Sequence, residues 1–310
     1  MKLLILEYVT AGGLGDPCLS PLLEEADAMA LALARDFSEL SEYTVSLIRH
    51  PRLAAPSPSF SVIPSTGLVS EWENAITQHD HILLVAPETD SILLKWSTRA
   101  DQLSTLRLGP TQEALRMTSD KWFTEAALSQ HHIPCVSSYR PDTMIPWSDH
   151  GDAWVLKPRD GCGCEGVQRF ARGDAGKQAL LQQAMQNPDH WMIQPWMPGQ
   201  AASLTILGSY EGAQLLSVNQ QHLQFDSEGF VTLEKVTTGA LDASPERFTA
   251  LVDSIHASVP GLLGIYGVDI LITPNALTVV EINPRVTSAY PDLYAVLGIN
   301  PAQLWLNSLS

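Results

Sequence analysis

Short, unbroken apolar runs alternate with amphipathic segments along the N-terminal third of the chain. Lys2–Tyr8 and His81–Val85 contain nearly continuous runs of Leu, Ile and Val, and Tyr43–Ile48 has Val45, Leu47 and Ile48 with Thr44 and Ser46 between them. Runs of this length and character are typical of buried parallel strands. Between them lie the Ala- and Leu-rich segment Ala26–Phe37 and the sequence Ser70–Glu73, which has the pattern of a capping box at a helix start. Alternating strands and helices predict an open α/β domain.

The rest of the chain has the patterns of both helices and strands. Helices are expected at Thr111–Gln130, Lys177–Gln186 and Glu246–Ser258, and strands at Val136–Tyr139, Trp154–Pro158, Trp191–Trp196, Gly264–Leu271 and Thr278–Asn283. Ser203–Val236 predicts several short strands with turns between them, and the Pro- and Ser-rich Pro51–Pro64 predicts a loop. We therefore expect three parts, namely an α/β domain at residues 1–110, a part with a Gly-rich loop at 111–192, and an α+β part at 193–310.

Composition narrows the classes of partner. The chain has 18 Lys and Arg against 34 Asp and Glu, a net charge of −16, which argues against nucleic acids and anionic membranes as partners. An apolar fraction of 45% excludes wholesale disorder. No apolar run approaches the ~20 residues of a membrane span, and the N-terminus lacks the pattern of a signal peptide. We expect a cytoplasmic protein.

The four cysteines are expected to be reduced thiols, as in other cytoplasmic proteins. Cys162 and Cys164 form a C-x-C pair that could ligate a metal ion. No C-x-x-C sequence and no His partner follow at the spacing of a zinc site, so we do not expect a metal there. The sequence leaves open whether this pair has another role.

An acidic and amide-bearing cluster near the C-terminus has the chemistry of a magnesium site. Glu281 and Asn283 are two residues apart on a predicted strand, so they share a face, and Asp269 on the preceding strand can join them across the hairpin. Oxygen ligands suit Mg²⁺ held together with nucleotide phosphates. Arg285 offers a planar fork for a phosphate or carboxylate. Solvated strand acids are the alternative, but the flanking residues are strongly apolar, which favours a functional role.

A second group of residues could hold a phosphate chain. Lys157 ends an apolar strand and is followed by glycines at Gly161, Gly163 and Gly166, whose loop can bring backbone N–H groups to a phosphate. The stretch is neither a P-loop nor a Rossmann motif. Considered alone it could be a flexible turn, and Lys121, 36 residues before Lys157, could be an ordinary helix lysine.

Considered together, these features resemble the ATP-grasp superfamily. Lys121, the strand and Gly-rich loop after Lys157, the strand Gln194–Trp196 and the box Glu281–Arg285 with its upstream Asp269 follow the order of that family over about the last 200 residues. Residues 1–110 resemble the domain that precedes ATP-grasp folds. Further stretches resemble the tyramine–glutamate ligase type of ATP-grasp enzyme, namely Leu6–Gly13, Ala86–Thr89, Ser119–Lys121, Gly199–Ser203 and Asn219–Gln221.

The resemblance implies an ATP-grasp fold behind a pre-ATP-grasp domain, with roles for individual residues. The implied roles are ATP-phosphate binding by Lys121 and Lys157, a mobile lid at Gly161–Gly166, an adenine hinge at Gln194–Met197 with backbone contacts from Trp196 and Met197, Mg²⁺ ligation by Asp269, Glu281 and Asn283, and stabilisation of an acyl-phosphate or its leaving phosphate by Arg285. Mn²⁺ is an alternative metal. Lys157 and Arg285 are the implied catalytic residues.

Three positions depart from the family pattern. Pro195 stands where many hinges carry a glutamate, Gln200 where an acid often reaches the ribose, and Gly267 where some relatives carry an arginine before the metal aspartate. These departures concern the hinge more than the metal ligands.

Candidate substrate residues follow several strands. Glu7, Tyr8 and Thr10 lie at the end of the first strand, and Glu88 follows the third, at the edge where open α/β sheets bind ligands. Packing within the loops is the alternative. Two further candidates are Ser203, which could orient a substrate or instead bond to the backbone, and Asn219, which the resemblance places in the cleft together with Gln220.

The implied activity is that of an ADP-forming carbon–nitrogen ligase that works through an acyl-phosphate. Glutamate and an aromatic amine or amino acid are the implied substrates, in cofactor synthesis of the methanofuran or methylofuran type. Another amino-acid or peptide substrate, and a non-catalytic ATP-binding protein, are the alternatives. The expected partners are thus a small-molecule carboxylate and an amine. Homodimers are common in the family, and the sequence leaves the oligomeric state open.

Overall fold

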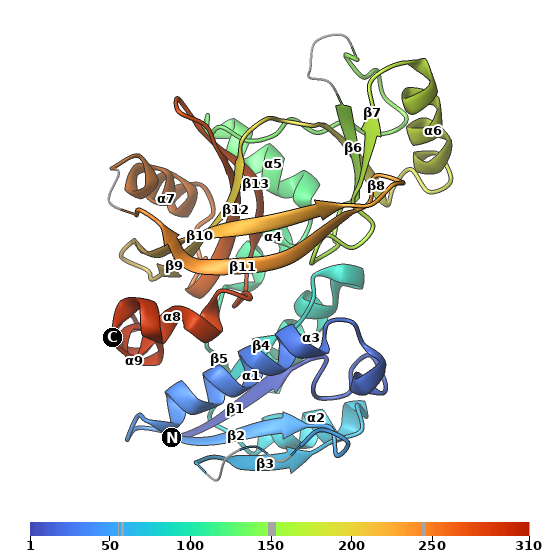
Figure 1. Ribbon diagram of the computed structural model, residues 1–310. Coiled ribbons are helices and arrows are strands. Elements are labelled where there is room, and N and C mark those ends of the chain that lie inside the picture. The colour runs from blue at the N-terminus through green and yellow to red at the C-terminus, as the bar shows by residue number, and fades with distance from the viewer. Residues whose placement is uncertain (55, 57–58, 104, 148–152, 244–245, 310) are drawn as a thin grey trace.

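The described residues form three β-sheets with helices around them (Figure 1). The computed structural model describes residues 1–54, 56, 59–103, 105–147, 153–243 and 246–309. The sheets follow one another along the chain, and the mixture of parallel and antiparallel sheets with helices confirms the predicted α/β and α+β class. The predicted boundaries at residues 110 and 192 stay a prediction. No helix in the described part of the chain is long and apolar enough to cross a membrane.

The N-terminal sheet is parallel, with strand order β3-β2-β1-β4-β5. Its strands are β1 (Lys2–Glu7), β2 (Thr44–Arg49), β3 (Ser61–Pro64), β4 (His81–Val85) and β5 (Leu106–Arg107), and the intervening helices are α1 (Leu23–Ser38), α2 (Val69–Thr77) and α3 (Ile92–Gln102), with single 3₁₀ turns at Pro17–Leu19 and Thr89–Ser91. The central strand β1 is buried from Leu3 to Glu7, as its apolar run predicts. This arrangement brings the carboxyl ends of β1 and β4 to one edge.

Two local predictions in this sheet are wrong. Part of the segment predicted as a loop is the edge strand β3, which pairs with β2, and the Ser46 and Ser61 hydroxyls are 2.9 Å apart. Other positions of that segment, Ala55, Ser57 and Pro58, lie outside the described residues. The expected capping box does not form, because α2 begins at Val69 and its Glu71 accepts instead from the Thr66 amide at 2.8 Å.

A small three-stranded antiparallel sheet, in the order β7-β6-β8, follows in the chain. It consists of β6 (Ala153–Pro158), β7 (Gln168–Ala171) and β8 (Trp191–Pro195), with α6 (Asp174–Ala184) against it. The Gly-rich loop connects β6 to β7. Figure 1 shows this sheet beside the ends of the long strands β10 and β11.

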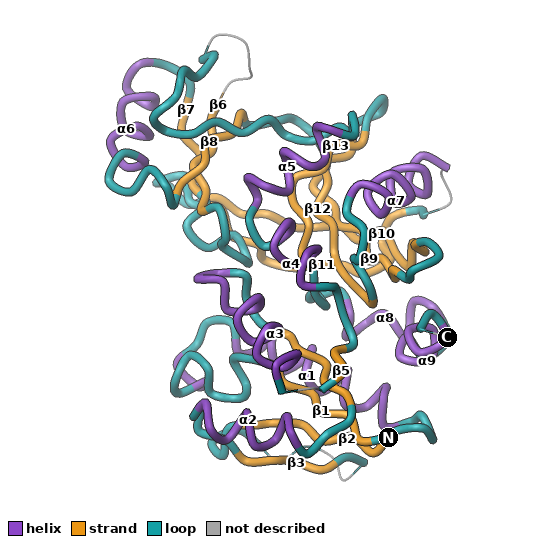
Figure 2. The backbone as a smooth tube through the Cα atoms, turned by 180° about the vertical axis from the view of Figure 1, so that it is seen from behind, coloured by secondary structure: helices purple, strands orange, loops and turns teal. Residues whose placement is uncertain are grey.

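The C-terminal sheet is antiparallel, in the order β11-β10-β9-β12-β13. Its strands are β9 (Gln200–Gly208), β10 (Ala213–Phe225), β11 (Val231–Leu241), β12 (Gly264–Ile272) and β13 (Leu277–Asn283). The apolar residues of one face, such as Leu204, Val218 and Val268, pack on helices α4, α5 and α7. Figure 2 shows these helices together on that side. The opposite face carries Ser203, Asn219 and Asp269 in mutual register, so alternation along the strands produces one apolar and one polar face.

The structure changes three predictions for this region. The stretch expected to form several short strands with turns between them forms three long strands, which are joined by turns and contain bulges. The single expected helix is two, α4 (Gln112–Thr118) and α5 (Lys121–Gln130), because Asp120 is extended and caps α5 by accepting from the Trp122 amide at 2.9 Å. The expected strand Val136–Tyr139 is reduced to an isolated bridge at Tyr139, with a second isolated bridge at Cys135 just before the segment. Helix α7 spans Glu246–Ser258 as predicted.

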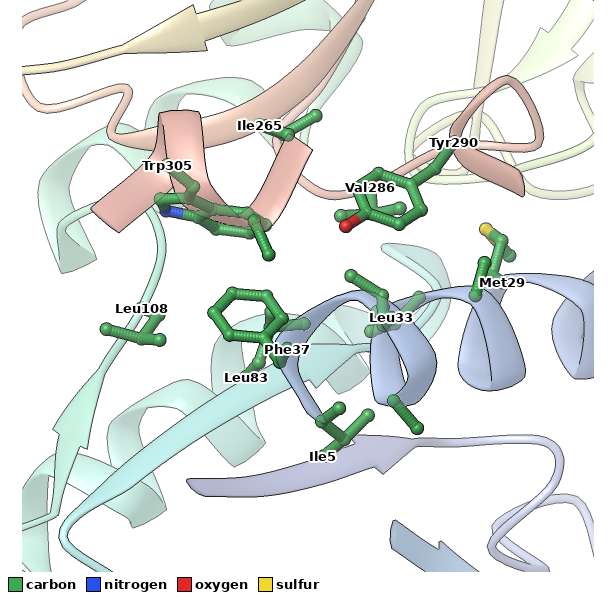
Figure 3. Packing of buried hydrophobic residues seen from close by; sticks show 14 of the residues in the cluster. Ile5, Met29, Leu33, Phe37, Leu83, Leu108, Ile265, Val286, Tyr290 and Trp305 are labelled. Carbon is green, nitrogen blue, oxygen red and sulfur yellow. The ribbon is translucent and has the colours of Figure 1, made fainter. Parts of the chain in front are cut away.

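The C-terminal helices join the two larger sheets. Helices α8 (Tyr290–Leu297) and α9 (Pro301–Asn307) have no counterpart among the predicted elements. Tyr290 and Trp305 enter the same apolar cluster as Leu33 and Phe37 of α1 and Ile265 of β12, as Figure 3 shows. This cluster attaches the N-terminal sheet to the C-terminal sheet.

Candidate active site

A cleft opens between the small sheet and the polar face of the C-terminal sheet. Lys157 and Met197 line it from the side of the small sheet, and Ser203, Asp269 and Glu281 line it from the C-terminal sheet. Its wall is apolar at residues such as Val155 and Leu271, and it is charged where Lys157, Asp269 and Glu281 contribute. An apolar slot with a few convergent charged groups is typical of a ligand site.

The β12–β13 hairpin brings the predicted metal ligands together. Asp269 is directly opposite Glu281, and Gly267 is opposite Asn283. A bulge lies between Asp269 and Ile270. Asp269, Glu281 and Asn283 all line the cleft. The predicted juxtaposition is therefore present, and ligation of a metal by these residues stays a prediction.

Two lysines converge on one of these carboxylates. Lys121 is the first residue of α5, Lys157 lies on β6, and each Nζ is 3.6 Å from Glu281 Oε2. Lys121 also donates to the Gly161 carbonyl. Lys157 is 3% exposed, and its Nζ has no hydrogen-bond partner among the described residues. Two cations thus meet at one acid, and a buried ammonium faces the cleft without a hydrogen bond.

Burial and neighbouring charges shift the pKa values of these groups. Burial lowers the pKa of Lys157, with the charge of Glu281 opposing this effect and that of Lys121 adding to it. Burial, and then the charge of Glu281, raises the pKa of Asp269. Burial alone would raise the pKa of Glu281, but the two lysines hold it below its ordinary value. Glu281 is therefore the ionised acid beside the lysines.

Arg285 is held by an acid from the N-terminal sheet. Its Nε lies 3.0 Å from Glu88 Oε1, and its Nη2 donates to Glu88 Oε2 at 3.1 Å. Both side chains are nearly buried, at 11% and 5% exposure. Burial alone would lower the pKa of Arg285, but the carboxylate of Glu88 raises it above its ordinary value. This pair connects the end of β4 to the chain after β13, and Arg285 also lines the cleft.

The Gly-rich loop is anchored at its start, through the adjacent residues Asp160 and Gly161. Lys121 contacts the carbonyl of Gly161, and the Asp160 carboxylate accepts from the Asp90 amide at 2.9 Å. Gly163 and Gly166 have positive φ angles of 60° and 71°. Gly161 and Gly163 line the cleft, and a Cβ at Gly166 would lie 3.1 Å from Pro158. The loop covers the charged end of the cleft.

Cys162 and Cys164 of this loop are free thiols that form no disulfide. Burial raises the pKa of Cys162, and burial with the nearby acids raises the pKa of Cys164 to about 12. Among the described residues, no three His, Cys, Asp or Glu side chains gather as a metal site.

The predicted hinge lies along the apolar part of the cleft. Gln194, Trp196 and Met197 all line it. The Gln194 side chain donates to Ser138 at 2.9 Å and to the Val136 carbonyl at 3.3 Å. The Trp196 amide already donates to the Ala153 carbonyl at 2.9 Å, so it is not a free donor for a ligand. Of the two residues expected to contact an adenine base through the backbone, Met197 is therefore the better candidate.

Most of the candidate substrate residues make contacts within the protein. Asn219 is fully buried and bonds to Ser203, Thr205, Ser217 and the Gly239 amide. Of the six candidates, Ser203 lines the cleft. The structure places Asn219 beneath it, as part of the sheet. The expectation that Gln220 lines the cleft is wrong, because Gln220 is paired with Ala202 and faces the other side of the sheet.

The three candidates at the end of β1 and just after it are also engaged by their surroundings. The Glu7 carboxylate accepts from the amides of Val9 at 3.2 Å and Thr10 at 2.7 Å, which closes the turn after the strand. Burial raises the pKa of Glu7. The Tyr8 ring meets Trp72 edge-on at 5.5 Å. Substrate binding by Glu7, Tyr8, Thr10 and Glu88 stays a prediction.

Several cleft residues were not singled out from the sequence. Gln221 donates to Asp269 Oδ1 at 3.0 Å, and Glu25, Thr287 and Ser288 line the cleft. Period-two alternation could have placed Gln221 on the same face as Asn219. Glu25 comes from α1, and no local pattern indicates that this helix reaches the cleft.

The described residues fit a metal–polyphosphate ligand. Lys157 Nζ is buried without a hydrogen-bond partner, and with Lys121 it supplies two cations at the charged end of the cleft. Asp269, Glu281 and Asn283 offer the oxygen atoms that Mg²⁺ prefers. The apolar wall suits a planar base.

Comparison with known families gives two matches that together span most of the chain. Residues 118–289 match the family described as ATP-grasp domain, and residues 43–115 match the pre ATP-grasp 3 domain. The first match covers more than half of the chain.

Individual proteins show the same relationship. The tyramine–L-glutamate ligase of Methanocaldococcus fervens is 25% identical over 296 residues, 92% of this chain and 87% of that protein. The enzyme of that name from Methanocaldococcus jannaschii is 25% identical over 209 residues, 67% of this chain and 56% of the relative. A crystal structure described as that of an ATP-grasp superfamily protein from Archaeoglobus fulgidus superposes with a TM-score of 0.78 at 22% identity, covering 100% of this chain and 89% of that one.

Proposed function

Because this chain belongs to the ATP-grasp family, we propose that it is an ATP-dependent ligase that forms an amide between a carboxylate and an amine. We propose glutamate as the acid and an aromatic amine or amino acid as the second substrate, in cofactor synthesis of the methanofuran or methylofuran type. The observation that carries the activity is the convergence of Lys121 and Lys157 on Glu281, opposite Asp269, in one cleft. The names of the two curated relatives support the choice of substrates.

In this proposal each cleft residue has a stated task. Asp269, Glu281 and Asn283 hold Mg²⁺, and Lys121 and Lys157 bind the phosphates of ATP, while Met197 contacts the base. Bound ATP and Mg²⁺ supply a phosphoryl group and the positive charge that makes its phosphorus accessible to an anion.

The substrate carboxylate must be activated before the amine can attack it, because a carboxylate has no good leaving group. The substrate carboxylate oxygen attacks the γ-phosphorus, the bond from that phosphorus to the β-phosphate oxygen breaks, and ADP leaves. The amine nitrogen then attacks the carbonyl carbon of the acyl-phosphate, the carbon–oxygen bond breaks, and inorganic phosphate departs as the nitrogen loses a proton. The products are an amide, ADP and phosphate.

The chain's residues contribute charge, position and exclusion of water. Both reactants of the first step are anions, so the lysines lower their repulsion. Arg285, oriented by Glu88, faces the cleft where the transferred phosphoryl group would carry negative charge. The Gly-rich loop covers this end and limits hydrolysis of the acyl-phosphate. Holding the carboxylate and amine together supplies the remaining acceleration.

A coupled assay tests the activity and the substrates together. The protein is incubated with ATP, Mg²⁺, glutamate and either tyramine or tyrosine, while phosphate release and product mass are recorded. We expect phosphate release that needs both substrates, and a product mass equal to their sum less one water.

The variant Asp269→Ala is expected to lose phosphate release, because it removes one of the two facing carboxylates. Turnover that survives in this variant would contradict the metal assignment. A different product from a wider panel of acids and amines would change the substrate, and nucleotide binding without turnover on the whole panel would indicate a non-catalytic binder.

A further inference from the structure

We propose that Gln221 is a positioning residue that fixes the carboxylate of Asp269, so that one oxygen is held by the protein and the other faces the cleft for a metal ion. The observation is the hydrogen bond from Gln221 Nε2 to Asp269 Oδ1 at 3.0 Å. The inference rests on the proposed function, because it assigns Gln221 to the metal site of that ligase. Metal ligands are commonly oriented by such outer contacts.

The contact crosses a whole strand of the sheet. Gln221 lies on β10 and Asp269 on β12, and β9 separates these two strands. Ser203 of β9 is paired with both Asn219 and Asp269, so these three residues share one face. Gln221 is two residues beyond Asn219 and therefore points to the same side.

A small residue in the middle strand leaves the path open. Gln220 is paired with Ala202, which brings the next position of β10, that of Gln221, beside Ala201. Ala201 has only a methyl group on the cleft side, and both it and Gln221 line the cleft. A long amide chain can therefore pass over Ala201 and reach Asp269, which a bulky residue at position 201 would prevent.

The identity of the donor matters for the charge at the site. Lys121 and Lys157 both lie against Glu281, and no ion pair to Asp269 is present in the described part of the chain. Among those same residues, Gln221 is the side chain that donates to Asp269. A neutral amide orients a carboxylate without neutralising it, whereas an ammonium would compete with a cation for the same charge. The arrangement thus holds Asp269 in place through a neutral donor, and a metal ion would not have to displace an ammonium from this carboxyl group.

Direct measurement of metal binding tests the proposal without relying on turnover. Mn²⁺ is titrated into the full-length protein in the presence of a non-hydrolysable ATP analogue, and bound Mn²⁺ is read by electron paramagnetic resonance. The variant Gln221→Met keeps the chain length and removes the donor, and Gln221→Asn keeps the amide but shortens its reach. The matched control is Gln220→Met, on the same strand, one residue away and facing the other side.

We expect both Gln221 variants to bind Mn²⁺ about 10- to 100-fold more weakly, as for other outer contacts of metal ligands. The control is expected to bind like the unaltered protein, and all four proteins are expected to unfold at similar temperatures.

Three outcomes would overturn the proposal. Unchanged Mn²⁺ affinity in both Gln221 variants would show that the hydrogen bond does not position Asp269. Equal weakening in Gln220→Met would assign the effect to the strand rather than to the donor. If the unaltered protein binds no Mn²⁺ with the nucleotide analogue, the proposed function itself fails, which is a different result from a loss confined to Gln221.

Discussion

At the scale of single residues, the pair of Arg285 and Glu88 shows how a buried charge is maintained. The two side chains are 197 positions apart and meet through two contacts of 3.0 and 3.1 Å. A buried guanidinium without a carboxylate would retain the desolvation penalty and lose the attraction that offsets it. Glu88 thereby determines where Arg285 points.

Breaking this pair from one side is expected to destabilise the fold. Glu88→Leu leaves the charge of Arg285 buried without its partner, which costs about 3–5 kcal/mol of unfolding free energy. The double variant Glu88→Leu with Arg285→Met removes both charges and is expected to recover much of that loss. Urea unfolding of the two single variants and the double variant forms the cycle, and simple additivity of the losses would contradict the prediction.

At the scale of elements, the Gly-rich loop depends on backbone angles that most residues avoid. Gly166 has a φ of 71°, and a Cβ there would approach Pro158 to 3.1 Å. Its conformation holds the end of the loop against β6, at the strand that carries Lys157.

Gly166→Ala is therefore expected to weaken nucleotide binding. The left-handed backbone costs a non-glycine residue about 1–2 kcal/mol, which corresponds to roughly a 5- to 30-fold higher Kd if the bound form needs this conformation. Calorimetric titration with a non-hydrolysable ATP analogue measures the change. Gly212→Ala is the control, because a Cβ at Gly212 meets no atom within 4 Å. Equal affinities for the two variants would argue against a role for the loop geometry.

The contact between α1 and the C-terminal helices makes stability depend on pH. Asp36 of α1 is fully buried, and its Oδ1 accepts from Arg35 Nε at 2.8 Å. Burial raises the pKa of Asp36, although the Arg35 contact opposes this shift. The folded state therefore holds a proton on Asp36 more tightly than the unfolded state, and the resulting stabilisation is lost as the pH rises through the raised pKa.

Asp36→Asn removes this titration. Compared with the unaltered protein, the variant is expected to gain in relative unfolding free energy as the pH rises from about 4, the ordinary range of an aspartate, to about 7. Urea unfolding of both proteins at several pH values measures the difference. A difference that stays constant, or that changes in the opposite direction, would contradict the prediction.

At the scale of the whole molecule, one apolar cluster unites distant parts of the chain. It contains Phe37 of α1, Ile265 of β12 and Trp305 of α9, and the rings of Phe37 and Trp305 meet edge-on at 5.9 Å (Figure 3). The N-terminal sheet is therefore held against the sheet that carries Asp269 and Glu281, and this contact brings Glu88 to Arg285.

Removal of the Trp305 ring is expected to lower the stability of the N-terminal and C-terminal sheets together. Trp305 is 2% exposed, and Trp305→Ala should cost about 3–5 kcal/mol of unfolding free energy. Far-ultraviolet circular dichroism in urea should still show one transition at a lower midpoint. The exposed Tyr210→Ala is the control, with a change within about 0.5 kcal/mol. Two separate transitions in the unaltered protein would contradict the joint core.

Local patterns were sufficient for much of the fold and for the chemistry of the site. The strands β1, β2 and β4 and the helix α7 are where the sequence places them. Alternation on β12 and β13 correctly places Asp269 opposite Glu281, because side chains two apart on a strand share a face. The order of charged and glycine residues was sufficient to indicate the ATP-grasp family.

Contacts between distant segments account for the features of the structure that were not predicted from the sequence. Strand β3 depends on its pairing with β2. The long strands β9 to β11 continue through bulges because they pair with neighbouring strands on both sides of each bulge. Gln221 reaches Asp269 across β9 because Ala201 is small and the strands are in that register.

The amino-acid sequence by itself determines which residues carry charge, which strands are apolar and which positions share a face, because these properties depend on residue type and on near neighbours. The tertiary structure alone decides that Glu88 holds Arg285, that two lysines share Glu281 and that Asn219 is occupied within the sheet. Those pairings depend on strand order and on the packing of remote helices, which the spacing along the chain does not contain.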